Sequence, residues 1–188
     1  MAGSKNVWRE AAMTKPRVYL AGPDLFFEDR DARYARLRAA CANAGLEAVA
    51  PTDGLEVRTE GPLSVAEQIY QHNLRLLRDC DGVLVNLSPF RGVEPDSGSV
   101  FEAAFATAIG KPVAAWIGDH WNTQERSAAL RKVWRDADGR VRDRHDGGLV
   151  EDFGLPANLM LACSFSVSPA PWQAIERLLM ALPVMEGV

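Results

Sequence analysis

The chain has 188 residues, 47% of them hydrophobic and 24% charged. This is the composition of an ordinary globular domain with a single core, and it excludes a chain that is mainly disordered. The net charge of -4 and the pI near 5.4 argue against a nucleic-acid-binding protein, because such proteins concentrate Lys and Arg on one surface. A small neutral ligand is easier to accommodate than a polyanion.

Neither a membrane span nor a secretion signal is visible. No run of 18 apolar residues occurs, and the first 15 residues lack the apolar centre of a signal peptide. We therefore expect a cytoplasmic protein without membrane contact, with a disordered extension at 1–15 and a single domain at 16–188. The three cysteines are widely spaced in apolar surroundings, which predicts reduced core thiols. No His or Cys pair has the spacing of a metal site, so no metal is expected.

Short apolar runs alternate along the chain with segments of helical period. The runs predict strands at 17–21, 46–50, 83–87, 113–117 and 164–167. The periodic segments predict helices at 29–44, 64–79, 99–109, 123–134 and 157–162, and a last helix that begins at Pro171. This alternation predicts an α/β fold with right-handed crossovers: a doubly wound, flavodoxin-like or Rossmann-like sheet of five parallel strands with helices on both faces.

Two stretches lack a pattern. Residues 52–63 are rich in Gly, Asp and Glu, which predicts a loop over the surface or over a site. Residues 118–148 are polar, and after the helix predicted at 123–134 they read RDADGRVRDRHDGG, with no period that could face a core. We expect this tract to be a mobile insertion.

In a doubly wound sheet, ligands bind at the carboxyl ends of the strands. There the first strand is followed by Gly22-Pro23-Asp24, and the third is followed by the stretch from Asp96 to Glu102. These two loops are the predicted site. Asp81 precedes the third strand and is expected to join Asp96 and Glu102, so that three acids gather at one strand-to-helix crossing.

Glu102 has two interpretations. Ser99 and Glu102 have the spacing of a capping box, in which the Glu only bonds back to the helix N-terminus. However, its helix neighbours are nearly all apolar, so the helix is expected to be buried on most sides, and burying an unpaired carboxylate is costly. A helix N-terminus favours the ionised form of a carboxylate, which suits a nucleophile. The residues alone leave both interpretations open.

The other polar candidates also have structural explanations. Asp96 is typical of a turn, Asp81 of a loop or a helix end, and Tyr19 of a packed aromatic. Together, three carboxylates could provide a nucleophile, a proton donor and a hydroxyl acceptor, as glycosyl chemistry requires. No GxGxxG, GxxxxGK[ST] or GxSxG motif occurs, which removes the commonest dinucleotide, P-loop and serine-hydrolase readings.

Four segments, in this order, resemble the nucleoside 2-deoxyribosyltransferases. They read VYLAGP at 18–23, DCDGV at 79–83, LSPFRGVEPDSGSVFE at 87–102 and FGLPANLML at 153–161. The resemblance covers about 17–180 and implies transfer of a 2-deoxyribosyl group between purine or pyrimidine bases in nucleoside salvage. It also implies deoxynucleosides and free nucleobases as the small-molecule partners and no cofactor.

The resemblance also implies roles for individual residues. Glu102 matches the nucleophile that forms a covalent deoxyribosyl-enzyme, and Tyr19 matches the tyrosine that holds it. Asp81 matches the acid that faces the nucleobase, and Asp96 matches the acid near the sugar hydroxyls. Further substrate-binding positions are Gly22, Pro23, Asn158 and Met160. The last two match residues that the family lends to a neighbouring subunit, which requires a homo-oligomer with shared active sites.

Departures and rival activities remain. Many relatives have Gly-Thr where this chain has Gly98-Ser99, a mild change because both hydroxyls cap helices. A hydrolase of deoxynucleosides or of deoxynucleoside 5'-monophosphates is the nearest rival, although Asp96 would repel a phosphate. The phosphoribohydrolases carry a double glycine that is missing here, and a nucleotide-sensing domain would not need a buried Glu102. Base preference, oligomer size and the role of 183–188 stay open.

Overall fold

The computed structural model describes residues 15–183, so almost all of the extension expected at 1–15 lies outside the described residues. Five strands form one sheet in the order β2-β1-β3-β4-β7, and every neighbouring pair is parallel. The strands are β1 (Arg17–Ala21), β2 (Glu47–Val49), β3 (Gly82–Asn86), β4 (Val113–Trp116) and β7 (Ser166–Ser168). The predicted five-stranded parallel sheet is therefore confirmed.

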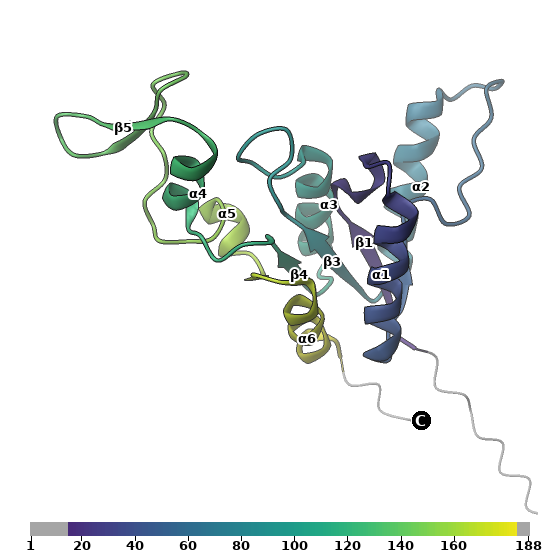
Figure 1. The fold of residues 1–188 in the computed structure, drawn as a ribbon. Coiled ribbons are helices and arrows are strands. Elements are labelled where there is room, and N and C mark those ends of the chain that lie inside the picture. The colour runs from purple at the N-terminus through teal and green to yellow at the C-terminus, as the bar shows by residue number, and fades with distance from the viewer. Residues whose placement is uncertain (1–14, 184–188) are drawn as a thin grey trace, which may run out of the picture.

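Helices connect the strands and cover both faces of the sheet (Figure 1). They are α1 (Arg30–Asn43), α2 (Val65–Asp79), α3 (Ser97–Ala108), α4 (Thr123–Leu130), α5 (Leu159–Ala162) and α6 (Pro171–Ala181). A short 3-10 helix, η1 (Pro23–Phe26), follows β1 where only a loop was expected. Among the described residues, no helix combines the length and the apolar character that a membrane crossing requires.

The alternation of side chains along β1 divides the core into two layers. Val18 and Leu20 pack in the cluster that includes the buried faces of α1 and α6. Tyr19 and Ala21 point to the other face and pack in the cluster that includes α2 and α3. Because successive strand residues face opposite sides, Tyr19 is directed toward the helix that carries Glu102.

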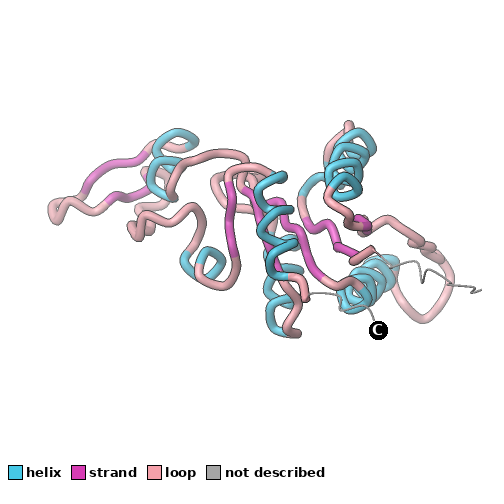
Figure 2. Tube along the Cα trace, turned by 90° about the horizontal axis from the view of Figure 1, so that it is seen from below, coloured by secondary structure: helices cyan, strands magenta, loops and turns pink. Residues whose placement is uncertain are grey.

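The polar tract after β4 contains a hairpin, an element that the sequence analysis did not predict. Helix α4 ends at Leu130, four residues earlier than predicted, and β5 (Val133–Arg135) pairs antiparallel with β6 (Val141–Asp143). The turn is closed by Asp136, whose carboxylate accepts bonds from the Asp138 and Arg140 amides and from the Arg142 side chain. Figures 1 and 2 show this hairpin lying apart from the five-stranded sheet.

The hairpin escaped prediction because it has no hydrophobic face of its own toward the sheet. Its charged residues show no regular spacing along the sequence. These residues form ion pairs across the turn, in which Arg140 and Arg142 both contact Asp136. A search for core-facing periodicity does not detect such pairs.

Candidate active site

Helix α3 begins earlier than the sequence predicted, and this decides between the two interpretations of Glu102. The N-cap is Asp96, whose Oδ2 accepts hydrogen bonds of 2.9 Å from both the amide and the hydroxyl of Ser99. Glu102 consequently lies in the second turn of the helix, out of reach of the N-cap amide. The capping box of Ser99 and Glu102 is therefore wrong.

The Glu102 carboxylate is instead held by two donors from other elements. Tyr19 Oη donates to Glu102 Oε1 at 2.6 Å, and Asn73 Nδ2 on α2 donates to the same oxygen at 3.3 Å. Within residues 15–183, Glu102 Oε2 receives no hydrogen bond. One oxygen is thus fixed, and the other is left with an unshared lone pair that can reach a substrate.

The surroundings of Glu102 raise its pKa into the physiological pH range. Partial burial is the main cause, and with the negative charge of Asp96 it raises the pKa of Glu102 to about 7, although the bonds from Tyr19 and Asn73 act in the opposite direction. Burial, followed by the nearby Glu102 charge, also raises the pKa of Tyr19, so Tyr19 stays a proton donor at neutral pH. A carboxylate with such a pKa, held in a defined orientation, is typical of a catalytic group.

Asn73 is a site residue that the sequence analysis missed. It sits among the apolar positions of α2, a helix whose start is fixed by the capping box of Ser64 and Glu67. Its Oδ1 is buried and has no hydrogen-bond partner among the described residues. The sequence signal that could have identified Asn73 is a polar residue within the apolar stripe of a helix.

Asp81 does not join the site, so the expected gathering of three acids is wrong. It precedes β3 and is exposed, and its Oδ2 accepts a 2.7 Å hydrogen bond from the backbone amide of Arg17 at the start of β1. Asp81 therefore closes the amino ends of the two strands, whereas the loops that follow β1 and β3 lie at their carboxyl ends. In a parallel sheet these ends face opposite sides of the molecule.

Gly22 and Pro23 lie where the chain turns at the boundary between β1 and β3, the point at which the strand order reverses. A Cβ atom on Gly22 would lie 2.7 Å from the Cβ of Asn86, so only glycine allows this close approach. Pro23 opens η1, and the buried Asp24 that follows accepts a 2.8 Å bond from Asn86 Nδ2 and a 3.3 Å bond from Arg33. The loop is thereby fixed to the end of β3.

The loops after β1 and β3 also bring together an aromatic group that the sequence analysis did not identify. Phe26 stacks on Phe90 with ring centroids 5.4 Å apart, and Phe27 meets Phe90 edge-on. The Arg91 guanidinium lies 4.6 Å from the Phe90 ring centre, and Phe26 remains 56% exposed. This leaves an open, flat apolar surface at the carboxyl ends of the two central strands.

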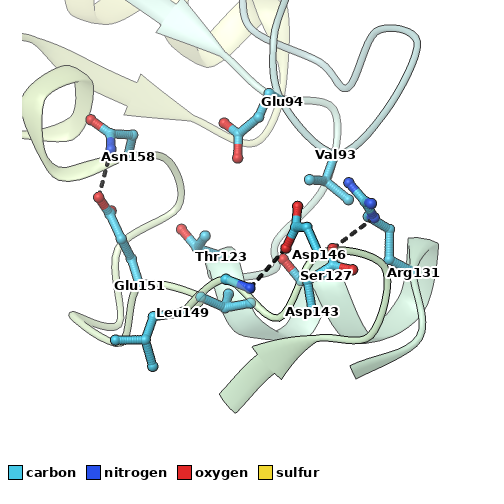
Figure 3. Close-up of a pocket in the computed structure, with 12 residues that line it drawn as sticks. Val93, Glu94, Thr123, Ser127, Arg131, Asp143, Asp146, Leu149, Glu151 and Asn158 are labelled. Carbon is cyan, nitrogen blue, oxygen red and sulfur yellow. Dashed lines mark hydrogen bonds and ion pairs between the residues drawn. The ribbon is translucent and has the colours of Figure 1, made fainter. Parts of the chain in front are cut away.

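Asn158 and Met160 lie apart from Glu102 in this chain. Asn158 is the N-cap of α5, and its Nδ2 donates to Glu151 Oε1 at 2.5 Å (Figure 3). Met160 is 68% exposed. Neither residue contacts the Tyr19–Glu102 pair within residues 15–183, and within the same residues no group of three His, Cys, Asp or Glu side chains could hold a metal ion.

Comparison with known proteins gives consistent matches. Residues 18–160 match the family model described as nucleoside 2-deoxyribosyltransferase. The chain is similar to a solved 2-desoxiribosyltransferase from Leishmania mexicana, with a TM-score of 0.67, 30% identity, and coverage of 86% of this chain and 95% of that chain. A conserved protein from Enterococcus faecalis V583 shares the fold, with a TM-score of 0.57, 18% identity, and coverage of 90% and 100%. An uncharacterized protein of Schizosaccharomyces pombe is 31% identical over 187 residues, 87% of this chain and 88% of that protein.

Proposed function

Because the chain belongs to the nucleoside 2-deoxyribosyltransferase family, we propose that it moves a 2-deoxyribosyl group from one nucleobase to another through a covalent intermediate on Glu102. The family and the structural match support a pentosyltransferase. The covalent step, the salvage role and the residues that act are our proposal.

The reaction consists of two displacements at one carbon. In the first, a lone pair of Glu102 Oε2 attacks the anomeric carbon, the carbon–nitrogen bond breaks, and the base leaves with the bonding pair and takes up a proton. In the second, a nitrogen of the incoming base attacks the same carbon, loses its proton, and releases the carboxylate. Two inversions give net retention, and no redox partner is needed.

The observation that carries this proposal is the geometry of Glu102. Its Oε1 is held at 2.6 Å by Tyr19, so the carboxylate is oriented for attack. Its pKa of about 7 leaves a substantial ionised fraction at neutral pH and makes the ionised carboxylate a stronger nucleophile than one with the ordinary pKa of 4.5.

The remaining substrate contacts follow from position. Asp96 uses Oδ2 for the helix cap, and its Oδ1, which has no hydrogen-bond partner within residues 15–183, is available to a sugar hydroxyl. The flat surface of Phe26 and Phe90 suits the face of a nucleobase. Asn158 and Met160 would come from a neighbouring subunit, which requires a homo-oligomer. Asp81 is given no part in this scheme, because it lies at the amino ends of the strands.

The function is tested by incubating the protein with a deoxynucleoside and a different free base, without phosphate, and separating the products by chromatography. A new deoxynucleoside is the expected product. Free deoxyribose alone would instead indicate a hydrolase, and no turnover would indicate a binding module. Glu102→Ala should abolish transfer while the fold is retained, and a variant that keeps most of its activity would show that Glu102 is not the nucleophile.

A further inference from the structure

Arg91, in the loop between β3 and α3, has an unusual backbone conformation. Among residues 15–183 it is the only residue other than glycine with a positive φ, 56°. Gly92, which could adopt this conformation at no steric cost, comes next, yet the strain falls on the arginine. A 3.0 Å hydrogen bond from the Phe90 amide to the Glu94 carbonyl closes the loop around it. Strain of this kind is concentrated at functional sites and persists only where other contacts stabilise the residue.

Two aromatic rings hold the Arg91 side chain. Its guanidinium carbon lies 4.6 Å from the centre of the Phe90 ring and 5.5 Å from the centre of the Phe26 ring, and these two centres are 5.4 Å apart. The three groups form a triangle in which the cation contacts both rings, and such contacts are attractive. The guanidinium is therefore positioned beside the aromatic surface that the proposed function assigns to the nucleobase.

The hydrogen-bond donors of this guanidinium are not used within the described part of the chain. Arg91 is exposed, and its known contacts there are those with the two rings. Arg33 differs: it lies 4.0 Å from the centre of the Phe27 ring, but its donors bind Asp29 at 2.6 Å and Asp24 at 3.3 Å. Arg33 thus serves an ion-pair network, whereas the five N–H donors of Arg91 are left for a ligand.

The charges of the loop favour a neutral ligand. Glu94 and Asp96 lie in the same loop as Arg91, so the loop carries two negative charges and one positive charge. A phosphate dianion bound to Arg91 would be repelled by two carboxylates, whereas a carbonyl oxygen or a ring nitrogen would not. Arg91 is therefore suited to donate hydrogen bonds to an uncharged base.

The forked guanidinium distinguishes bases by the donors and acceptors along their edges. Guanine, like any 6-oxopurine, presents two neighbouring acceptors, O6 and N7, that match the fork. Adenine and cytosine present an amino donor at this edge, and thymine presents a single acceptor. Given the proposed function, on which this step rests, we propose that Arg91 determines base preference. It donates two hydrogen bonds to O6 and N7 of a 6-oxopurine that stacks on Phe26.

The test is calorimetric titration of the full chain carrying Glu102→Ala, which prevents turnover, with 2'-deoxyinosine and separately with 2'-deoxyadenosine. We expect tighter binding of deoxyinosine. Adding Arg91→Gln should weaken deoxyinosine binding about tenfold or more and preserve or strengthen deoxyadenosine binding, because a Gln amide pairs with N6 and N7 of adenine. Arg91→Lys keeps the charge but loses the fork, so it should also weaken deoxyinosine binding.

A change in the ligand checks the same contact without a change at Arg91. The 7-deaza analogue of deoxyinosine lacks the N7 acceptor, so it should bind several-fold more weakly, and Arg91→Gln should weaken its binding less than that of deoxyinosine. The matched control is Arg177→Gln, at an exposed arginine of α6, which should change neither affinity. Urea unfolding of each variant checks that the fold is kept.

Equal losses for the two nucleosides, or an equal loss in the control, would overturn the role of Arg91. So would absence of saturable deoxyinosine binding, or a loss confined to nucleoside 5'-monophosphates, which would assign Arg91 to a phosphate. The two proposals can fail separately. Transfer activity with a base preference that Arg91→Gln leaves unchanged would remove only the role of Arg91. Deoxyinosine binding that depends on Arg91, in a chain that catalyses no transfer, would instead contradict the proposed function.

Discussion

At the scale of single residues, the site depends on how one carboxylate is protonated. Tyr19 and Asn73 donate to the same oxygen of Glu102 and stabilise its ionised form, while burial opposes ionisation. The net result is a pKa of about 7 in place of the ordinary 4.5. Catalysis and stability should therefore both change with pH between these two values.

Tyr19→Phe should move the acidic limb of the pH profile to higher pH. The hydroxyl lowers the pKa of Glu102, so its loss raises that pKa and reduces the ionised fraction. We expect kcat/KM to fall about tenfold at pH 6 and less at pH 8. The control is Tyr34→Phe, which removes a buried hydroxyl that has no partner among residues 15–183. Equal pH profiles for the two variants would contradict the role of Tyr19.

Glu102→Gln should remove a pH dependence of stability. Because the pKa of Glu102 is higher in the folded chain than its ordinary 4.5, the folded state binds more protons between pH 4.5 and about 7. The stabilisation is complete below 4.5 and is lost as pH rises through 7. The free energy of unfolding should be measured in urea at pH 5 and at pH 8. Between these two pH values, the free energy of unfolding of the variant should rise by about 1 to 3 kcal/mol relative to that of the unchanged chain. A constant difference would mean that Glu102 is not perturbed.

At the scale of elements, α3 shows how one side chain serves both a helix and a site. Asp96 caps the helix with one oxygen and faces Glu102 closely enough to raise the pKa of Glu102. The sequence predicted the strand, the loop and the helix here, but it placed the helix start at Ser99, because Ser99 and Glu102 also match a capping motif. The sequence alone cannot decide whether Glu102 bonds back to the helix N-terminus or faces the site. The hydrogen bond from Tyr19 to Glu102 in the structure decides it.

Substitutions at Asp96 should separate the two roles. Asp96→Ala loses the cap and should cost about 1 kcal/mol of unfolding free energy. Asp96→Ser keeps a capping oxygen but loses the carboxylate, so we expect near-normal stability together with a KM for deoxynucleoside raised about tenfold or more. Urea unfolding and initial-rate kinetics measure both quantities. An unchanged KM in Asp96→Ser would remove Asp96 from the substrate site.

At the scale of the whole molecule, the pattern of apolar residues was enough to predict the sheet, because buried parallel strands are short apolar runs separated by amphipathic helices. Glu102 became a candidate because it lies on an apolar helix, whereas Tyr19 alone indicated only a packed aromatic and its role was implied by the family resemblance. Asp81 was misplaced because nearness in sequence to β3 does not say which end of the sheet a residue occupies. The aromatic pair of Phe26 and Phe90 joins loops 60 or so residues apart, which no local pattern connects.

The proposed sharing of sites between subunits can be tested with two exposed methionines. Met160 is 68% exposed on α5, and Met180 is 71% exposed on α6. If Met160 completes a neighbour's site, Met160→Glu should dissociate the oligomer in light scattering and lower activity at least about tenfold, because it buries a charge. Met180→Glu is the control and should change neither. Full activity of a monomeric Met160→Glu variant would show that one chain is sufficient.

The contact between Gly22 and Asn86 determines where variation is possible around the site. Any side chain at position 22 would collide with the Asn86 Cβ, at 2.7 Å, whereas a Cβ at Gly92, in the loop after β3, meets nothing within 4 Å. The two glycines follow neighbouring strands, yet only at Gly22 does a neighbouring residue leave no room for a side chain. Position 92 therefore has room for a side chain, whereas position 22 must remain glycine for the two strand ends to keep this contact.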